Sequence, residues 1–401
     1  MISGDRALAE GKHGAFFNTL EEFHKYWERI DIIAPKSTKH RIQNTNKAQN
    51  TEHKTQTEVL FGNVFVHSSP WPLLFQTKFI YRKGKEIFKH HKFDVVTVHE
   101  YPPFYNGIGA RLLWQKIKVP YVLEVFHIPG HPRAAGIKEI VYKFLFKLFI
   151  KFDSSKAKAV RVMNPVRSKM PLRGSSADHA SEAGWTSNGM NQKQVPDFLV
   201  GAGVPKEKIV YIPAIYVDLD IFKPMNVAKE YDLIFVGRLE KNKGINLFLE
   251  AVRKLNCKAV IVGDGSLGKE IKLKIENWKL KINMHGWAKD SHEIAELLNK
   301  SKVLVMPSYN EGGPRVVLEA MSCGVPVLAT PVGIVPDLLK NGSGGEIIAW
   351  DAEDIAKKAV GLLNDPEKYQ KYNQSGVEIA GQFEKKAAIK NYAEKLQNLL
   401  K

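Results

Sequence analysis

Short apolar runs alternate with amphipathic helical patterns along nearly the whole sequence. In the first half the apolar runs span residues 29–35, 64–67, 94–100, 121–127 and 159–164. In the second half they span residues 231–237, 258–263, 282–286, 302–307 and 326–330. Apolar runs of this length that alternate with helices are typical of parallel sheets with helices on both faces. The pattern therefore predicts an α/β chain with two doubly wound, Rossmann-like domains.

The boundary between the domains is predicted in a segment rich in Pro and Asp, residues 211–224. We expect an N-terminal domain over residues 1–212, a C-terminal domain over 213–383 and a final helix over 384–401. Ligands of such sheets bind in the crevice outside the carboxyl ends of the strands, here between the two domains. Residues 1–3 are expected to end a first strand whose beginning is missing, so Met1 is questioned as the true start. Residues 165–192 are rich in Ser, Gly, Asn and Ala and are expected to be a loop insertion.

Composition narrows the class of protein. The 401 residues carry 59 Lys and Arg against 42 Asp and Glu, a net charge of +17, which suits nucleic acid, an anionic membrane or a phosphorylated substrate. Cys257 and Cys323 are too few for a disulfide scaffold, and both are expected to be reduced and structural. No signal-peptide pattern and no apolar run of ~20 residues is present, so a cytosolic enzyme, peripheral on a membrane at most, is expected.

The most informative motif follows the run that ends at Pro307. A Gly-Gly-Pro turn, residues 312–314, leads into a helix with Pro314 expected in its first turn. The free amides at such a helix start, expected at residues 314–317, can hold a phosphate. Glu311 precedes the helix and Glu319 lies within it, so both carboxylates can border one pocket and accept hydrogen bonds from sugar hydroxyls. For an isolated pair, a solvated helix residue and a turn residue would be the simpler interpretation.

A second motif, residues 235–244, places Arg238 and Lys243 just after a strand. The planar guanidinium of Arg and the mobile ammonium of Lys can together neutralise a leaving diphosphate. The alternative interpretation of this motif is an exposed basic turn.

Together these motifs resemble the E-x7-E region and the diphosphate clamp of family 4 glycosyltransferases, which have the GT-B fold. The resemblance implies a retaining enzyme without a metal or other cofactor, with a nucleotide-sugar donor in the C-terminal domain and the acceptor in the N-terminal domain. It also implies that the last helix crosses back to the N-terminal domain. It assigns Glu311 to the donor sugar and Glu319 to the ribose. Gly313 stands where the family has an aromatic residue, and Pro314-Arg315 replaces Gly-Leu, which leaves the identity of the sugar open.

The same resemblance supplies the remaining site residues. His127, at the end of a strand, matches the cleft histidine near the reacting sugar, with His99 and His131 as weaker candidates. Catalytic roles are therefore implied for His127, Glu311, Arg238 and Lys243. Gly14, with Gly4 and Gly11, resembles the N-terminal glycine loop. Trp287 is expected either to contact the base or to pack, and Asp264 to be a turn residue. The full donor site is expected to comprise Gly14, Arg238, Lys243, Gly263, Gly286, Trp287, Glu311, Gly313, Pro314, Arg315, Val316 and Glu319.

Two further patterns carry open alternatives. Residues 136–152 form a helical pattern with an apolar face and lysines at every fourth position from Lys143. Packing on the sheet is the simpler interpretation, and contact with an anionic membrane the other. Asp218 and Asp220 form a D-x-D pattern in the linker, where the family has no metal role.

The sequence thus favours a hexosyltransferase that acts in glycolipid, polysaccharide or other cell-envelope glycan synthesis, with a lipid-linked or glycan acceptor. A nucleotide-sugar epimerase, a sugar phosphorylase and an inactive relative on the same fold are alternatives. A nucleic-acid-binding protein is disfavoured, because the sequence has no recognition helix, zinc spacing or basic strand studded with aromatics.

Overall fold

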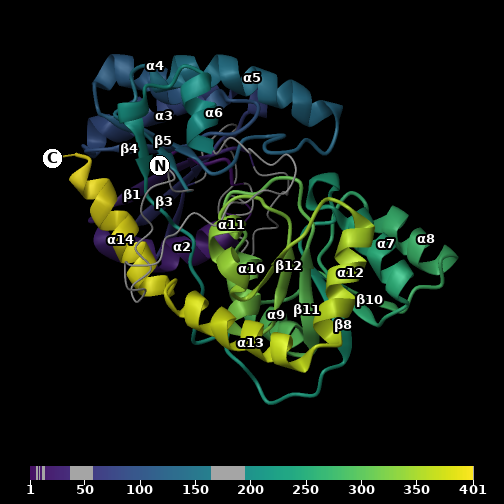
Figure 1. Cartoon of the computed structure of the whole chain (residues 1–401). Helices are drawn as coiled ribbons and strands as arrows, with labels where there is room; N and C mark the ends of the chain where they lie inside the picture. Colours follow the sequence, from purple (N-terminus) through teal and green to yellow (C-terminus); the bar gives the residue numbers. More distant parts are fainter. Residues whose placement is uncertain (6–7, 9, 11–13, 37–56, 164–194, 401) are drawn as a thin grey trace, which may run out of the picture.

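Two sheets, each covered by helices, organise the chain, as the computed structural model in Figure 1 shows. The structure describes residues 1–5, 8, 10, 14–36, 57–163 and 195–400. The expected loop insertion at 165–192 and Gly11 lie outside these residues. The α/β class and the two Rossmann-like sheets agree with the prediction.

The N-terminal sheet is built around residues 1–3. Ile2 bridges in parallel to Ile33 on one side and Val98 on the other, so it joins a three-stranded and a four-stranded sheet. The strand order is β2-β3-β1, then Ile2, then β4-β5-β6-β7. The bounds are β1 (Ile30–Ala34), β2 (Thr57–Leu60), β3 (Val64–Ser68), β4 (Val96–His99), β5 (Tyr121–Val125), β6 (Ala159–Val162) and β7 (Ile209–Tyr211).

One strand departs from the predicted parallel pattern. β2 pairs antiparallel with β3 through a tight turn in which Phe61 and Gly62 both have positive φ. Two consecutive residues with positive φ form the turn that suits the twist of a hairpin. Strand β2 lies at the edge of the sheet, and its residues alternate between exposed and half-buried positions. The sequence has no long apolar run at these residues.

The helices of this domain cover both faces of its sheet. They are α2 (Ala15–Phe23), η1 (His24–Tyr26), η2 (Leu73–Phe75), α3 (Gln76–His90), α4 (Tyr105–Ile117), α5 (Ile137–Ser154), α6 (Val195–Gly201) and η3 (Lys206–Lys208).

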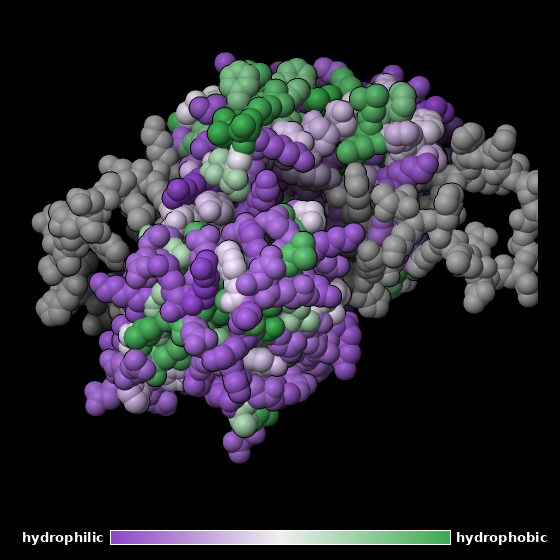
Figure 2. All heavy atoms as spheres, turned by 90° about the vertical axis from the view of Figure 1, so that its right-hand side faces the viewer, coloured by the Kyte–Doolittle hydropathy of each residue, from purple (hydrophilic) through white to green (hydrophobic). Residues whose placement is uncertain are grey.

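Helix α5 is apolar on two sides. Phe146 and Ile150 are buried in the core, as packing on the sheet requires. On its outer side Phe144 is 63% exposed and Leu148 57%, and they belong to an exposed stripe that comprises Ile137, Ile140, Val141, Phe144, Leu148 and Phe152. Figure 2 shows hydrophobic side chains gathered at this upper end of the molecule, where Figure 1 places α4 and α5. Packing on the sheet therefore explains only half of the apolar pattern.

The C-terminal sheet is fully parallel, with strand order β10-β9-β8-β11-β12-β13. Its strands are β8 (Tyr231–Val236), β9 (Ala259–Val262), β10 (Ile282–Gly286), β11 (Ser301–Met306), β12 (Val327–Ala329) and β13 (Gly345–Ile347). Its helices are η4 (Lys241–Lys243), α7 (Ile245–Leu255), α8 (Gly268–Asn277), α9 (Ser291–Asn299), α10 (Arg315–Ser322), α11 (Val335–Leu338), η5 (Lys340–Gly342), α12 (Ala352–Leu363) and α13 (Pro366–Gly381). Since the carboxyl ends of parallel strands share one edge, the loops after β8 and β11 are neighbours.

Two chain segments cross between the domains. The amide of Val217 donates to the carbonyl oxygen of Phe383 (2.9 Å), so the linker and the start of the last helix run side by side. That helix, α14 (Lys385–Asn398), returns to the N-terminal domain, where the Tyr392 hydroxyl donates to Glu124 (2.6 Å). Asp218 of the D-x-D pattern accepts a hydrogen bond from Lys385 (3.3 Å) and so ties the two crossing segments together.

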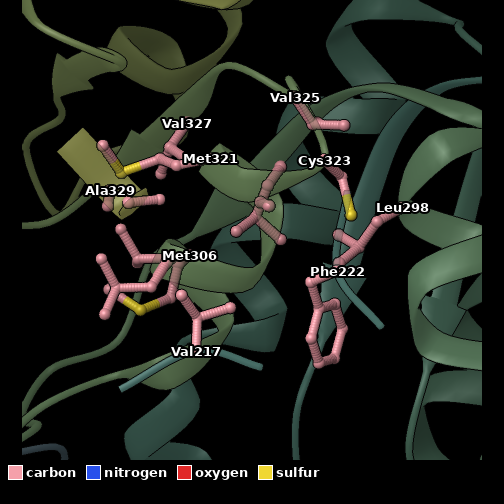
Figure 3. Packing of buried hydrophobic residues seen from close by; sticks show 14 of the residues in the cluster. Val217, Phe222, Leu298, Met306, Met321, Cys323, Val325, Val327 and Ala329 are labelled. Atoms are coloured by element: carbon pink, nitrogen blue, oxygen red, sulfur yellow. The ribbon is translucent and has the colours of Figure 1, made fainter. Parts of the chain in front are cut away.

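The core beneath the second sheet includes linker side chains. Figure 3 shows Val217 and Phe222 beside Met306, Met321 and Cys323. Cys323 is buried, and burial raises the pKa of its thiol to about 12, so the thiol packs as an apolar group, as expected. Among the described helices, none is long and apolar enough to cross a membrane.

Candidate active site

The loops after β8 and β11 are fastened to each other. Gly244 has φ +69°, and a Cβ there would lie 2.0 Å from the carbonyl oxygen of Pro307, so only glycine fits. The amide of Tyr309 donates to the carbonyl oxygen of Asn242 (2.8 Å). This junction brings together the two motifs that the sequence places 68 residues apart.

Lys243 and Glu311 form an ion pair at the junction. The Nζ of Lys243 lies 2.5 Å from Oε1 of Glu311, and the hydroxyl of Ser308 donates to the same oxygen (3.0 Å). Both charged side chains are mostly buried, so the pair is shielded from water. Arg238, in the same loop as Lys243, is exposed.

The N-terminal domain touches this junction at Phe126 and His127. A Cβ on Gly312 would lie 1.9 Å from the carbonyl oxygen of Phe126, so the two backbones are in direct contact. Burial lowers the pKa of His127, and the charges of Glu311, Lys243 and Arg238 all act on its imidazole. The four residues with implied catalytic roles, His127, Arg238, Lys243 and Glu311, therefore meet at one place between the domains.

Helix α10 begins one residue later than predicted. Pro314 is its N-cap, with φ −71° and ψ 99°, and the helix starts at Arg315. Proline has no N–H, and the amide of Val317 donates to the carbonyl oxygen of Pro314 (3.1 Å). Among the described residues, only the amides of Arg315 and Val316 therefore remain of the free amides expected at residues 314–317.

Arg315 and Glu319, both on α10, lie in different environments. The guanidinium of Arg315 lies 4.7 Å from the ring centre of Tyr216, so this residue contacts the linker. Burial raises the pKa of Glu319 to about 6, while the charge of Arg315 opposes that rise. Within the described part of the chain, the Glu319 carboxylate accepts no hydrogen bond from another residue.

Three glycines meet where β8, β9 and β10 end. Gly263 has φ +137°, its Cβ would lie 2.0 Å from the carbonyl oxygen of Gly237, and its amide donates to Gly286 (2.6 Å). Beside them lies a cavity of about 430 Å³, bordered by Gly263, Gly286 and helix α8. Trp287 is 72% exposed, so the packing role offered for it is wrong. Asp264 accepts a hydrogen bond from the next amide, that of Gly265 (2.7 Å), as expected of a turn residue.

The N-terminal glycine segment lies at the base of α2. Gly14 is the N-cap of α2, with extended backbone angles. The hydroxyl of Tyr101 occupies the space that a Cβ on Gly4 would need. The ring of His131 lies at a tilt to that of Phe198, with ring centres 5.3 Å apart, so His131 packs against α6.

A buried polar network was missed from the sequence. His99 lies 3.2 Å from the Ser3 hydroxyl and 3.1 Å from Glu124, and Glu124 also binds Arg161 and Tyr392. The Arg161 guanidinium holds the pKa of Glu124 at about 2 against the effect of burial. The sequence feature that could have indicated this network is one charged residue in each of two apolar strands, Glu124 in β5 and Arg161 in β6.

Comparison with known proteins now defines the class. Residues 218–379 match the family model described as glycosyl transferases group 1. An uncharacterized glycosyltransferase of Methanocaldococcus jannaschii is 25% identical over 80% of this chain and 82% of its own. These matches identify the chain as a glycosyltransferase.

Several other relatives of this glycosyltransferase match over less than half of their own length. A Campylobacter jejuni N-acetyl-D-galactosaminyltransferase, whose name gives an undecaprenol-linked glycan as substrate, is 31% identical over 40% of this chain and 46% of its own. Among solved structures, sucrose-phosphate synthase of Thermosynechococcus elongatus has a TM-score of 0.71 at 16% identity, covering 99% and 94% of the two chains. HepE of Anabaena, with UDP and glucose, has a TM-score of 0.70 at 18% identity, covering 99% and 98%. These structures show the GT-B fold.

Proposed function

We propose that this enzyme transfers a hexose from a nucleotide-diphosphate sugar to an acceptor hydroxyl, with retention of configuration. The observation that carries the proposal is the meeting of Lys243, Glu311 and His127 beside the start of α10. A cationic side chain and free helix amides suit a diphosphate, whereas a carboxylate suits sugar hydroxyls. The UDP and glucose named for HepE support this ligand class.

In the proposed complex, Arg238, Lys243 and the amides of Arg315 and Val316 bind the diphosphate. Glu319 accepts hydrogen bonds from the ribose, and Glu311 from the donor sugar. As the glycosidic bond breaks, charge grows on the departing phosphate, and its stabilisation is the main catalytic term. The acceptor attacks the same face of the sugar, and its proton passes to the leaving phosphate, so no protein nucleophile or metal is required.

The base and the acceptor take the two remaining sides of the site. The cavity beside Gly263 and Gly286 would receive the nucleobase, with Trp287 exposed at its edge. Neutral His127 and the segment at Gly14 would face the sugar from the N-terminal domain. We propose domains over residues 1–212 and 213–383, with closure at residues 213–224 and a crossover over 384–401.

We further propose a lipid-linked glycan acceptor, reached from the inner face of a membrane. The exposed stripe of α5 combines aromatic and aliphatic side chains with the exposed lysines Lys138, Lys147 and Lys151. Such a surface suits the boundary of an anionic bilayer. The undecaprenol-linked substrate named for the Campylobacter relative supports the same class.

A transfer assay tests the proposed function. Purified enzyme is mixed with UDP-, GDP- or ADP-sugars and a lipid-linked glycan extract, and free nucleotide and extended lipid are both quantified. One donor should yield nucleotide and product in equal amounts, with the anomeric configuration retained by NMR. Conversion of the donor without the acceptor would favour an epimerase, and the absence of turnover with every donor would contradict the proposal.

A further inference from the structure

Asn310 joins the two domains at the residue before Glu311. Its side-chain Nδ2 donates to both carboxylate oxygens of Glu139, at 3.1 and 3.0 Å. Glu139 belongs to the first turn of α5 in the N-terminal domain, 171 residues away in sequence. Asn310 is only 2% exposed, so water does not compete effectively for this contact.

The Glu139 carboxylate is itself held in place. Its Oε2 accepts a hydrogen bond from the backbone amide of Ala135 (2.7 Å), which closes the turn before α5. The negative charge of Glu139 also acts on His127 and opposes the lowering of the pKa of that imidazole by burial. Glu139 is thus fixed, and it lies close to the residues proposed to surround the donor sugar.

The loop around Asn310 has little freedom of its own. Glu311 is bound by Lys243 and Ser308, and the Tyr309 amide by Asn242. From the N-terminal domain, the guanidinium of Arg133 lies 5.5 Å from the ring centre of Trp350. Trp350 in turn donates to the carbonyl oxygen of Ser308 (2.9 Å). Most of these contacts lie within the C-terminal domain, whereas the hydrogen bonds from Asn310 to Glu139 join the loop directly to the opposite domain.

We infer that Glu139 is a positioning residue that sets Glu311 through Asn310 when the two domains are closed. This inference rests on the proposed function, since it assigns to the acceptor domain a share in orienting the donor-sugar carboxylate. An open arrangement would break this contact and leave Nδ2 of Asn310 without the Glu139 carboxylate, while Oδ1 of Asn310 keeps only the long contact from Asn242 (3.5 Å). The orientation of Glu311 would therefore depend on closure. Transfer is thereby coupled to closure without a change in the affinity for the nucleotide.

A swap of hydrogen-bond partners tests the inference. Asn310→Asp places a second carboxylate against Glu139 and should lower kcat about tenfold or more, because two like charges then face each other at a buried contact. Adding Glu139→Gln restores an amide that donates to a carboxylate, and kcat should recover to within about threefold of wild type. The nucleotide Kd should stay constant, because neither residue contacts the proposed diphosphate or base sites.

Asn364→Asp and Glu207→Gln, both on exposed side chains, are the matched controls and should leave kcat unchanged. The inference is overturned when Asn310→Asp behaves like Asn364→Asp, or when the double variant is no better than the single one. Inactivity of the wild type with every donor would instead count against the proposed function. Hydrogen exchange of the backbone amides in residues 307–313 is a second test of the inference. Exchange should be faster in Asn310→Asp than in the wild type and should slow again in the double variant. Equal exchange rates in the three proteins would overturn the inference.

Discussion

The Nζ of Lys243 lies 2.5 Å from Oε1 of Glu311, so the two opposite charges form an ion pair. The ion pair joins a residue proposed to bind the diphosphate to one proposed to bind the sugar. Under the proposed function, an incoming diphosphate would compete for Lys243 and leave Glu311 to accept hydrogen bonds from sugar hydroxyls. The proposed function thus predicts that donor binding and the release of Glu311 from Lys243 occur together.

Removal of the Lys243 cation should affect the chemical step most strongly. Lys243→Ala is expected to lower kcat/KM about 100-fold to 1,000-fold, the range measured for loss of one stabilising donor in other enzymes. Nucleotide release at saturating acceptor measures the effect. Lys241→Ala, an exposed lysine two residues away, is the control and should retain nearly full activity. Equal losses in the two variants would contradict the assignment.

Glu319 should make the enzyme less stable as the pH rises. Its pKa is about 6 in the folded protein against 4.5 in the unfolded chain, so the folded state holds the proton more tightly between these values. The contribution of Glu319 to the free energy of unfolding is then largest below pH 4.5, and it falls by about 2 kcal/mol as the pH rises past 6.

Glu319→Gln removes this ionisation, so the variant should gain stability relative to wild type between pH 5 and 7 while donor affinity falls. Urea unfolding and nucleotide-sugar titration at several pH values measure both quantities. A constant difference in the free energy of unfolding between the two proteins across this pH range would contradict the assignment.

Gly312 should be required for closure of the domains. Gly312→Ala would put a Cβ 1.9 Å from the carbonyl oxygen of Phe126, and backbone atoms cannot move aside cheaply. We expect kcat/KM to fall about 100-fold, because a small displacement of reacting groups has effects of that size. Gly361→Ala is the control, since nothing lies within 4 Å of its Cβ. This variant should keep its activity and gain up to about 1 kcal/mol of stability.

The exposed stripe of α5 should control membrane binding. Phe144→Glu combined with Leu148→Glu is expected to weaken binding to phosphatidylglycerol vesicles by about tenfold or more, since burial of each side chain contributes about 1.5–3 kcal/mol. Co-sedimentation measures this effect. The same substitution at Leu273, which is equally exposed on α8, is the control. Unchanged sedimentation of the double variant would remove the support for a peripheral enzyme.

Much of the fold followed from local patterns. Each predicted apolar run overlaps a strand in the structure, because buried parallel strands need continuous apolar residues. Strands β2, β7 and β13 were missed because they are short and carry no such run. The sequence pattern of α5 was interpreted as one apolar face, whereas the structure has one buried and one exposed apolar side. Periodicity alone does not reveal which side of a helix contacts the sheet.

The site was predictable where residues lie in one motif. Glu311 and Glu319 share a loop and the helix that follows it, so local spacing was enough to predict that both border one pocket, and this stays a prediction. The network of His99, Glu124, Arg161 and Tyr392 depends on strand order and on the return of α14, which local spacing does not determine. The contact between Asn310 and Glu139 likewise depends on how the domains meet.

A thermal-shift panel tests the central claim most directly. Wild type and Glu319→Ala are heated with UDP-, GDP- and ADP-sugars in the absence of added metal. The account predicts that one nucleotide raises the Tm of the wild type and that this increase is lost in the variant. An unchanged Tm with every nucleotide sugar, or the same increase in both proteins, would contradict a donor site at Glu311 and Glu319.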